Sequence, residues 1–538
     1  MTKVVEELIN QGSKLFSDRP QLLRMWQDLA ENFYPERADF TSDRIPGAEA
    51  KLELAASHPV LARRDLGNAL SNTRPTTKNW FHTRTKYDWD KVSPVGRAWL
   101  ERSEEIQRRA MLHRTSQFLR ATTELDHDWA TFGQGIIQPS FNSATQGLLY
   151  RSWHLRDVVW TENVDGVVHT VYRQWKPRAV DLKNLFPASI HRDVAAKLEK
   201  DPYCEVPTWH VVVPAGMYTA VNTKHPFVSL FIDIARKHVM EAKGVMELGY
   251  IIPRWATISG SQYAFSPATA IALMDARGLQ SMMYTLLEAG EKAVNPPMAA
   301  NKHVFGGQAP RAYAGGTTWA DYTDGALKDH FQMIEMDKSG IPLGLEMMRD
   351  LREQISEAMY SKRILLPPMV SHVSAYEMGE RAKQHIREIL PLFSPYEDEV
   401  NAPLCDDAFE KLLRVGAFGP PLDMPEELRG AEIEFSFESP LHDAVDQAKV
   451  QVFMDMNQQM TTAMAVDQTV KHVVNMGVAY RDVIQANQTP AKWMRTEAEA
   501  QSRADNEKAA ADASQALALQ QQGADVAHTI GDTNIPGA

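Results

Sequence analysis

The first 130 residues alternate apolar and charged positions with the period of an α-helix. In the segment 20–34, apolar side chains recur three and four residues apart: Leu22, Leu23, Trp26, Leu29, Ala30 and Phe33. Residues at this spacing share one face of a helix, so the pattern predicts an amphipathic helix. A longer helical region is predicted over 96–133, with its buried side marked by Leu100, Ile106, Leu112, Phe118, Leu119, Leu125 and Trp129.

From about residue 147 to residue 255 the period changes to two, which is typical of strands. β-Branched and aromatic residues lie on either side of Asp165-Gly166, a dipeptide that favours a tight hairpin turn. A short helical insert is predicted near 178–200. We therefore expect a β-rich module set inside a helical chain.

Two long helices around a compact excursion are predicted next. The first covers 267–293, because Ser266 is a suitable N-cap and Pro267 suits the first helical position. Its apolar stripe contains Leu279, Met282, Met283, Leu286 and Leu287. Residues 294–342 are rich in glycine turns with short β-like pieces, and the second helix covers 343–361. That helix places Met348, Leu351, Ile355 and Met359 on one side.

An apolar run interrupted by prolines follows the second helix. Its residues are Ile364, Leu365, Leu366, Pro367, Pro368, Met369 and Val370. The run is too short to span a membrane, and its prolines exclude a regular helix. Ser374 and Glu377 then have capping-box spacing, so a new helix is predicted to begin there. The run is either a loop exposed for function or buried core between two helices.

The last part of the chain is predicted to be helical apart from one strand. A helix around 402–415 stops at Gly416, and Ile433, Phe435 and Phe437 alternate with glutamates as in a half-buried strand. From Leu441 onward the pattern is helical. The tail beyond about 496 is rich in alanine, glutamine and acids, so it buries little alone and is either frayed or held by copies of itself.

Composition and charge exclude several classes of protein. The chain has 538 residues, 44% of them hydrophobic, which is ample for a core but includes no run of 18 apolar residues. Its start, with acids and no long apolar segment, is not expected to be a secretion signal. Cys204 and Cys405 are the two cysteines, which fits a reducing compartment. A net charge of −12 argues against broad electrostatic binding of nucleic acid, although not against enclosing it.

The chain contains no strong catalytic motif. The glycines near Gly306 lack the Gly-Lys-Ser/Thr element of a phosphate-binding loop, and no Gly-x-Ser-x-Gly elbow occurs. The 17 histidines are scattered without zinc-ligand spacing. No pair of carboxylates lies in an apolar setting suited to acid–base catalysis. We therefore expect a protein that is not an enzyme and that binds no cofactor or metal.

Five segments, in order, resemble the head-to-tail connector (portal) proteins of short-tailed bacteriophages. They are RMWQDLAENFYPERADF, LARRDLGNALSNTRPTTKNWFHTR, DHDWATFGQGII, YIIPRWATISGSQYAFSPATAIALMDARGLQSMMYTLLEAGEKAVNPPM and ISEAMYSKRILLPPMVSHVSAYEMGERAKQHIREILPLFSPYEDEVNAPL. The resemblance covers about residues 20–405. The family usually has threonine where Ser374 stands, and serine keeps the cap.

The resemblance implies an α+β, predominantly helical fold with a wing, a two-helix stem, a clip and a C-terminal helical crown. The wing would comprise residues 1–266, with its β-rich module at about 147–255. The stem helices would be 267–293 and 343–361, around a clip at 294–342. Residues 362–438 would hold a channel loop and the return part of the wing. The crown would be 439–503, and 504–538 a barrel or tail helix.

The resemblance also implies a ring of about twelve copies at one capsid vertex, assembled in the host cytoplasm and forming part of the virion. Double-stranded DNA would pass through it, and the expected partners are the terminase large subunit, major capsid and scaffolding proteins and a tail adaptor, with no membrane. The channel loop would comprise Lys362, Arg363, Ile364, Leu365, Leu366, Pro367, Pro368 and Met369.

Charged residues of the second stem helix are further candidates for lining the channel: Glu346, Arg349, Asp350, Arg352, Glu353 and Glu357. Mixed charge would hold DNA weakly, which transport requires, because each firm phosphate contact adds affinity. The same charges could equally form pairs between subunits. Two other functions stay open: a self-assembling tail-hub or scaffold protein without a DNA channel, and a hydrolase with an unfamiliar site, which a compact polar cluster in a closed pocket would reveal.

Overall fold

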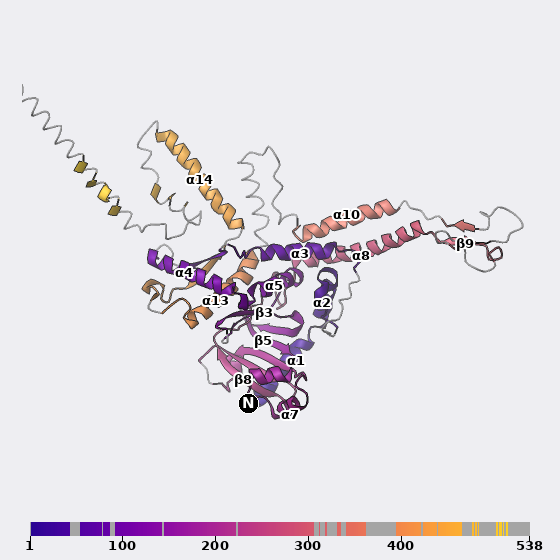
Figure 1. Cartoon of the computed structure of the whole chain (residues 1–538), viewed down its shortest axis with the longest axis horizontal. Helices are drawn as coiled ribbons and strands as arrows, with labels where there is room; N and C mark the ends of the chain where they lie inside the picture. Colours follow the sequence, from indigo (N-terminus) through magenta and orange to yellow (C-terminus); the bar gives the residue numbers. More distant parts are fainter. Residues whose placement is uncertain are drawn as a thin grey trace, which may run out of the picture. The chain divides into compact units, whose positions relative to one another are not determined.

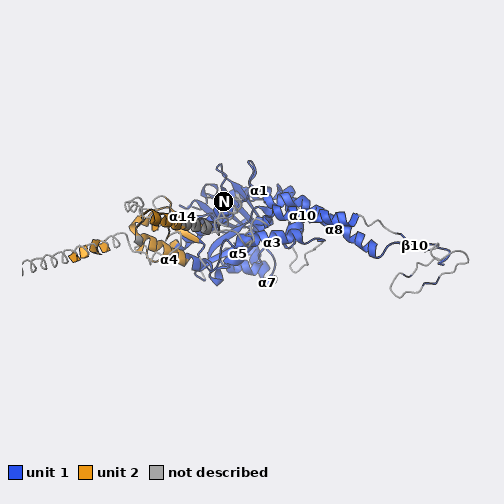
Figure 2. Cartoon of the chain, turned by 90° about the horizontal axis from the view of Figure 1, so that it is seen from above, with its two compact units in different colours: residues 1–80, 107–412 blue, residues 81–106, 413–538 orange. Residues whose placement is uncertain are grey.

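The computed structural model describes residues 2–42, 54–77, 79–86, 92–142, 145–221, 224–305, 311, 318–319, 331–334, 340–361, 394–420, 423–437, 440–464 and a few positions between 476 and 514. The chain forms two compact units, coloured differently in Figure 2. The first comprises residues 1–80 and 107–412, and the second comprises 81–106 and 413–538. The fold is α+β with more helix than strand, as predicted.

An antiparallel sheet of five strands, ordered as in the sequence, lies in the first unit. Its strands are β4 Val158–Glu162, β5 Val168–Trp175, β6 Thr208–Pro214, β7 Phe227–Asp233 and β8 His238–Val245. β4 and β5 form the hairpin predicted at Asp165-Gly166, where Gly166 adopts a φ of 77°. A second hairpin joins β2 Ile137–Asn142 to β3 Gly147–Ser152, so the β-rich region begins ten residues before the predicted 147.

Helices cover both faces of the five-stranded sheet (Figure 1). α1 Thr2–Ser17 packs Val5 and Leu8 onto one face, where Val211 and Leu230 lie. On the other face, α6 Ala179–Leu185 and α7 Arg192–Lys200 form a second cluster with Met240. Successive strand residues point to opposite faces, so this layering follows from the period of two.

The N-terminal helices confirm the predicted apolar stripe. α2 Pro20–Phe33 buries Trp26, Leu29, Ala30 and Phe33. It is followed by α3 His58–Ser71. The region predicted over 96–133 is divided into α4 Pro94–Met111 and α5 Phe118–Phe132 by a turn ending at Gln117, with φ 54°. That turn resets the helical phase, so Leu119 is 47% exposed and its predicted burial is wrong.

A hairpin of two long helices also belongs to the first unit (Figure 1). α8 Pro267–Val294 matches the predicted 267–293, and α10 Gly340–Ala358 begins three residues before the predicted 343. Between them, β9 Met298–Ala300 pairs with β10 Phe331–Met333. The first unit also contains most of α13 Ala402–Val415, after which Gly416 has a φ of 76°.

The second unit is held by two strands that are far apart in sequence. β1 Phe81–Thr85 pairs with β11 Ile433–Phe437, and Phe81 faces Phe437. Glu104 on α4 accepts the backbone N–H of Thr83 at 2.6 Å, which fixes that helix to the strand pair. α14 Pro440–Met464 follows, in agreement with the helical pattern predicted from Leu441.

Candidate functional site

The α8–α10 hairpin begins at a buried junction with α5. Ser266 caps α8 by accepting the N–H of Thr269 at 3.4 Å and donates to the carbonyl of Ala130 at 2.8 Å. Thr269 donates to the carbonyl of Thr131 at 2.6 Å. These hydroxyls satisfy carbonyl groups that the C-terminus of α5 would otherwise leave unpaired. The base of the hairpin is therefore fixed to the body of the first unit.

Gly133 makes this junction possible. It ends α5 with a φ of 72°, and a Cβ atom there would lie 2.0 Å from the carbonyl carbon of Phe265. A side chain at this position would thus meet both backbone strain and a backbone clash. The glycine lets the end of α5 touch the start of α8.

The two helices of the hairpin pack through small and apolar residues. α8 buries Ala268, Ala272, Ala276 and Leu279, and the predicted stripe of α10 is confirmed by the burial of Met348, Ile355 and Met359. Gly344 faces Leu286, and a Cβ on it would lie 3.0 Å from a methyl carbon of that leucine. The glycine therefore allows close approach of the helices.

The hairpin exposes large apolar side chains along α8 and on the first half of α10. On α8 these are Ile271, Met274, Tyr284, Leu287 and Val294, and on α10 they are Leu343, Leu345 and Met347. A hollow of about 700 Å³ lies along the last turns of α8, lined in part by Leu286 and Leu287. Leu287 belongs to the predicted apolar stripe but is 54% exposed. Several exposed apolar side chains on one element mark it as a candidate for contact with another protein.

The predicted charged residues of α10 lie opposite its buried side. Glu346, Asp350, Glu353 and Glu357 are all exposed, and their spacing of four, three and four residues places them in one row. Arg349 is exposed beside this row. The structure thus brings the four acids together on one helix face.

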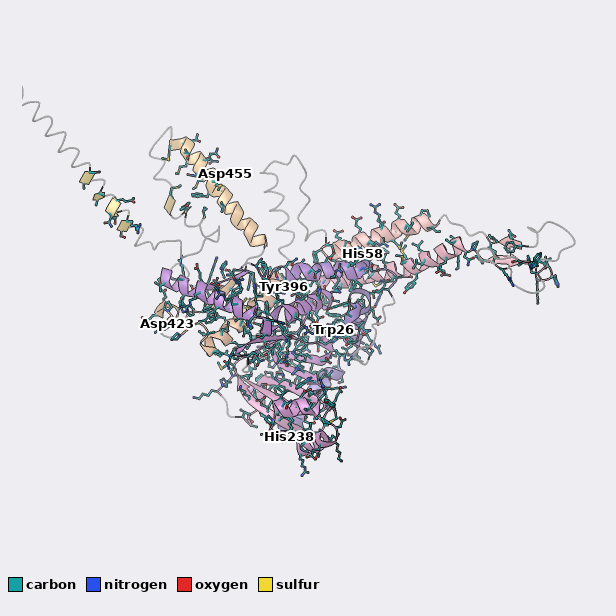
Figure 3. All side chains as sticks on the ribbon, viewed as in Figure 1. Trp26, His58, His238, Tyr396, Asp423 and Asp455 are labelled. Atoms are coloured by element: carbon teal, nitrogen blue, oxygen red, sulfur yellow. The ribbon has the colours of Figure 1, made fainter. Side chains whose placement is uncertain are left out.

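Arg352 differs from the other charged residues of α10 because it is half-buried. The His58 ring of α3, labelled in Figure 3, lies with its Nε2 2.9 Å from both the carbonyl oxygen of Arg352 and the hydroxyl of Ser356. These contacts fix the rotation of α10, which leaves the acidic row on the side away from Met348 and Ile355.

The predicted channel loop, Lys362 to Met369, and the predicted capping box at Ser374 lie outside the described residues. The chain on either side of that segment is described. Tyr360, with a φ of 57°, stacks on Trp255 with 6.2 Å between ring centroids. Trp255 stacks on Trp129 at 4.1 Å, and Tyr396 meets the edge of Trp129 at 5.2 Å. One aromatic column therefore anchors both flanks of the segment.

A buried ionic network reinforces the second flank. Arg74 forms an ion pair with Asp126, and both side chains bond to the hydroxyl of Tyr396, which is labelled in Figure 3. Arg74 also donates to the side-chain oxygen of Asn401 at 3.0 Å, and Ser71 donates to Asp126 at 2.6 Å. Burial opposes the charge of Arg74, but Asp126 raises its pKa above the ordinary value. The network stays ionised because its charges are paired.

Sequence reasoning missed both the column and the network. It placed Trp129 on a buried helix face, but Arg74 and Tyr396 are separated by 322 positions, and no local period links them. Among the described residues, no three histidine, cysteine or acidic side chains cluster as a metal site would require. None of the described helices has both the length and the hydrophobicity that crossing a bilayer requires.

The family of the chain is identified from its sequence. Residues 5–494 match the model of the bacteriophage head to tail connecting protein family. The chain belongs to this family. It is a head-to-tail connector, or portal protein, and it is a component of the phage particle.

Individual relatives agree with the family. The chain is 23% identical to the probable portal protein of Bordetella phage BPP-1, over 81% of this chain and 79% of that one. It is 22% identical to the portal protein of Salmonella phage epsilon15, over 80% and 78% of the two chains. Among solved structures, chains of the virion and the neck of a gene transfer agent particle align with a TM-score of 0.33 and 8% identity. They cover 80% and 78% of this chain and 94% and 93% of their own.

Proposed function

We propose that copies of this connector form a ring of about twelve at one capsid vertex, which serves as the channel for genome packaging and ejection. The observation that carries the proposal is the exposed apolar surface of the α8–α10 hairpin, whose first residues, Ser266 and Thr269, are anchored within one chain. Leaving such surface in water costs roughly 25 cal/mol per Å², so association of neighbouring hairpins is favoured. Oligomeric assembly is also what the family implies.

In this proposal the α8–α10 hairpin is the stem, and the segment that contains β9 and β10, about 294–342, is the clip. Residues 1–266 form the wing together with the part of 362–438 that follows the loop. The crown comprises 439–503 and the terminal barrel or tail helix 504–538. The clip serves as the docking platform, first for the terminase large subunit and later for a tail adaptor. Capsid and scaffolding proteins contact the wing during assembly in the host cytoplasm.

The acidic row of α10 faces the DNA in this proposal. Four carboxylates at Glu346, Asp350, Glu353 and Glu357 repel phosphates, while Arg349 beside them moderates the repulsion. DNA is then enclosed without firm contacts, since firm contacts add affinity and slow sliding. The alternative is that the row pairs with basic residues of a neighbouring subunit.

The segment from Lys362 to Met369 projects into the channel as an apolar loop. The aromatic column of Tyr360, Trp255, Trp129 and Tyr396 supports this placement, because it fixes the points at which the longer segment 361–395 leaves the body and returns to it. Pro367 and Pro368 further restrict the backbone. The alternative is that these residues fill core space in the wing. The protein performs no catalysis in this scheme, and the energy for packaging comes from a separate motor.

Electron microscopy of the purified protein, with class averages of end-on views, tests the ring directly. The expected result is a ring of about twelve copies around a central hole wide enough for DNA. Compact monomers or dimers at micromolar concentration would contradict the proposal. A closed oligomer without a hole would instead favour a tail-hub or scaffold protein.

The acidic row is tested by exchanging its four acids for amides: Glu346→Gln, Asp350→Asn, Glu353→Gln and Glu357→Gln. A matched control changes four exposed acids elsewhere in the first unit: Glu7→Gln, Asp18→Asn, Glu199→Gln and Glu205→Gln. Both variants alter the charge of the chain equally. We expect only the first to retain double-stranded DNA in the ring at low salt and to lose it as salt is raised. Equal retention by both variants would mean that the row does not face DNA.

A further inference from the structure

A pocket of about 330 Å³ lies at one face of the five-stranded sheet, beside the β2–β3 hairpin. It is lined by residues from that hairpin, from strands β5, β7 and β8 and from the end of α6. The lining comprises Gln138, Ser140, Leu149, Arg151, Trp153, Arg173, Trp175, Leu185, Phe186, Phe231 and Glu241. The lining is thus mainly aromatic and aliphatic, and the volume is near the lower end of small-molecule sites.

Arg173 is the unusual member of this lining. Its residue is only 4% exposed, and its Nε donates to the hydroxyl of Tyr250 at 3.0 Å. Its guanidinium lies 3.8 Å from the ring centroid of Trp153 and 5.4 Å from that of Trp175. Within the described part of the chain, its Nη1 is buried without a hydrogen-bond partner, and no ion pair of Arg173 is formed. Arg173 therefore carries a buried charge with unused donors.

The groups in direct contact with Arg173 do not supply a compensating anion. Burial raises the pKa of Tyr250 to about 12, so this hydroxyl stays neutral. His210 lies 2.5 Å from the same hydroxyl, and burial together with Arg173 lowers the pKa of His210 well below its ordinary value. Asp157 attracts Arg173 from a distance but accepts a hydrogen bond from Gln174 at 3.3 Å. An uncompensated buried cation is costly, so binding of an anion is favoured.

The lining indicates what kind of anion fits. Flat aromatic walls from Trp153, Trp175 and Phe231 suit an aromatic body. The fork of an arginine suits the two oxygens of a carboxylate, which loses less hydration on entering apolar surroundings than a doubly charged phosphate does. Two exposed lining residues act in opposite directions, since Arg151 attracts an anion and Glu241 repels it.

We propose that this pocket binds an aromatic carboxylate, with the carboxylate on the terminal nitrogens of Arg173 and the ring between Trp153, Trp175 and Phe231. The carboxylate belongs either to a free small molecule or to an acidic side chain next to an aromatic residue on a partner protein. Both sources present the same chemistry to the pocket. The site is independent of the proposed DNA channel.

Saturation-transfer NMR on the full chain tests the site, with phenylacetate as the probe and phenylacetamide as its uncharged counterpart. We expect phenylacetate to bind with a Kd of about 1 mM, as suits a ligand of this size, and phenylacetamide at least about tenfold more weakly. Equal binding of the two probes, or no binding of phenylacetate, would overturn the proposal.

Two variants test whether phenylacetate binds in this pocket. Arg173→Gln is expected to abolish the difference between the two probes, and Trp175→Leu to weaken phenylacetate severalfold while keeping every hydrogen bond of Arg173. The control is Arg192→Gln, which removes a fully solvated arginine of α7 in the same unit. Thermal unfolding checks the fold of Arg173→Gln, since it loses the bond to Tyr250. Unchanged binding in a folded Trp175→Leu protein would overturn the proposal.

The capped dipeptide N-acetyl-Phe-Glu-amide separates the two sources. If it competes with phenylacetate, the carboxylate comes from a partner's side chain. If phenylacetate binds and the dipeptide does not, the ligand is a free small carboxylate. Either result supports the pocket as a carboxylate site.

Discussion

The region around Asp126 and the α8–α10 hairpin differ in how far the groups of one chain find partners within that chain. Around Asp126, the charged group of Arg74, the hydroxyl of Tyr396 and the amide of Asn401 all find partners inside the first unit. On the hairpin, apolar side chains such as Ile271 and Leu287 are left in solvent. Both regions belong to the same unit and are joined at Ser266.

The difference distinguishes a region that is complete within a single chain from a region that gains from contact with other chains. A buried ionic network is stable only if every member is present, so it has to be finished within the protomer. Apolar helix faces tolerate exposure singly and gain from association later. The body can therefore reach its final structure before assembly, while in the proposed ring the hairpin reaches its final environment only on assembly.

The largest effect on stability is expected from removing Asp126 from the buried ionic network. Asp126→Ala leaves the guanidinium of Arg74 buried without its carboxylate, which should cost about 3–5 kcal/mol of stability. Thermal and urea unfolding of the protein measure the loss. As a control, Glu353→Ala on the exposed face of α10 should change stability by less than about 0.5 kcal/mol. Similar losses of stability in both variants would show that the two regions do not differ in this way.

A smaller loss is expected from overfilling the contact between α1 and the sheet. A Cβ at Gly12 would lie 2.4 Å from Cζ3 of Trp209, so Gly12→Ala forces the helix or the indole to move, at about 1–3 kcal/mol. Gly290 of α8 has no atom within 4 Å of such a Cβ, so Gly290→Ala should be neutral or stabilise by up to about 1 kcal/mol. Urea unfolding compares the two, and a stabilising Gly12→Ala would contradict the packing.

The stability of the first unit should also depend on pH through Asp407. Burial, opposed by Lys411 and assisted by Glu247, raises the pKa of Asp407 to about 7. An unfolded aspartate has a pKa of about 3.9, so the folded chain holds an extra proton between these values. Because the folded state binds more protons, stability falls as pH rises through this window.

Asp407→Asn removes this titration. Between pH 5 and pH 8, the variant should lose less stability than the parent protein does. Thermal unfolding at both pH values measures the difference, with Asp406→Asn as the neighbouring control. If the parent and Asp407→Asn lose the same stability over this range, Asp407 does not titrate as described.

Substitutions on the hairpin surface should have the smallest effect on the stability of the protomer. Their effect on assembly should be large. Leu287→Ser and Ile271→Ser remove exposed apolar groups, so each should change unfolding by less than about 0.5 kcal/mol. Mass photometry should nevertheless show fewer complete rings at a given concentration. Full ring formation by the double variant would mean that these side chains are not subunit contacts.

Local signals predicted the parts of the fold that depend on neighbours in sequence. Ser266 and Pro267 marked the start of α8, Asp165-Gly166 marked the β4–β5 turn, and alternation marked β11. The pattern also selected Leu287 for an apolar stripe, but a stripe does not reveal which part of it the same chain covers.

Contacts between distant segments could not be predicted in this way. The approach of Gly133 to Phe265 and the ion pair of Arg74 with Asp126 depend on how helices meet, and no period in the sequence encodes that. For the candidate site, the four acids of α10 were identified and lie in one exposed row. Whether the row faces a channel is a property of the assembled ring, so it stays a prediction.

The pairing of β1 with β11 has a consequence for synthesis of the chain. The two strands are about 350 residues apart, so β1 leaves the ribosome long before its partner exists. At roughly 5–20 residues per second, the wait is on the order of 20–70 s. During that time β1 is an unpaired strand edge, which tends to pair with other chains. A chain that stops before residue 433 cannot form the β1–β11 pair. The pairing therefore distinguishes chains that contain β11 from shorter ones before assembly.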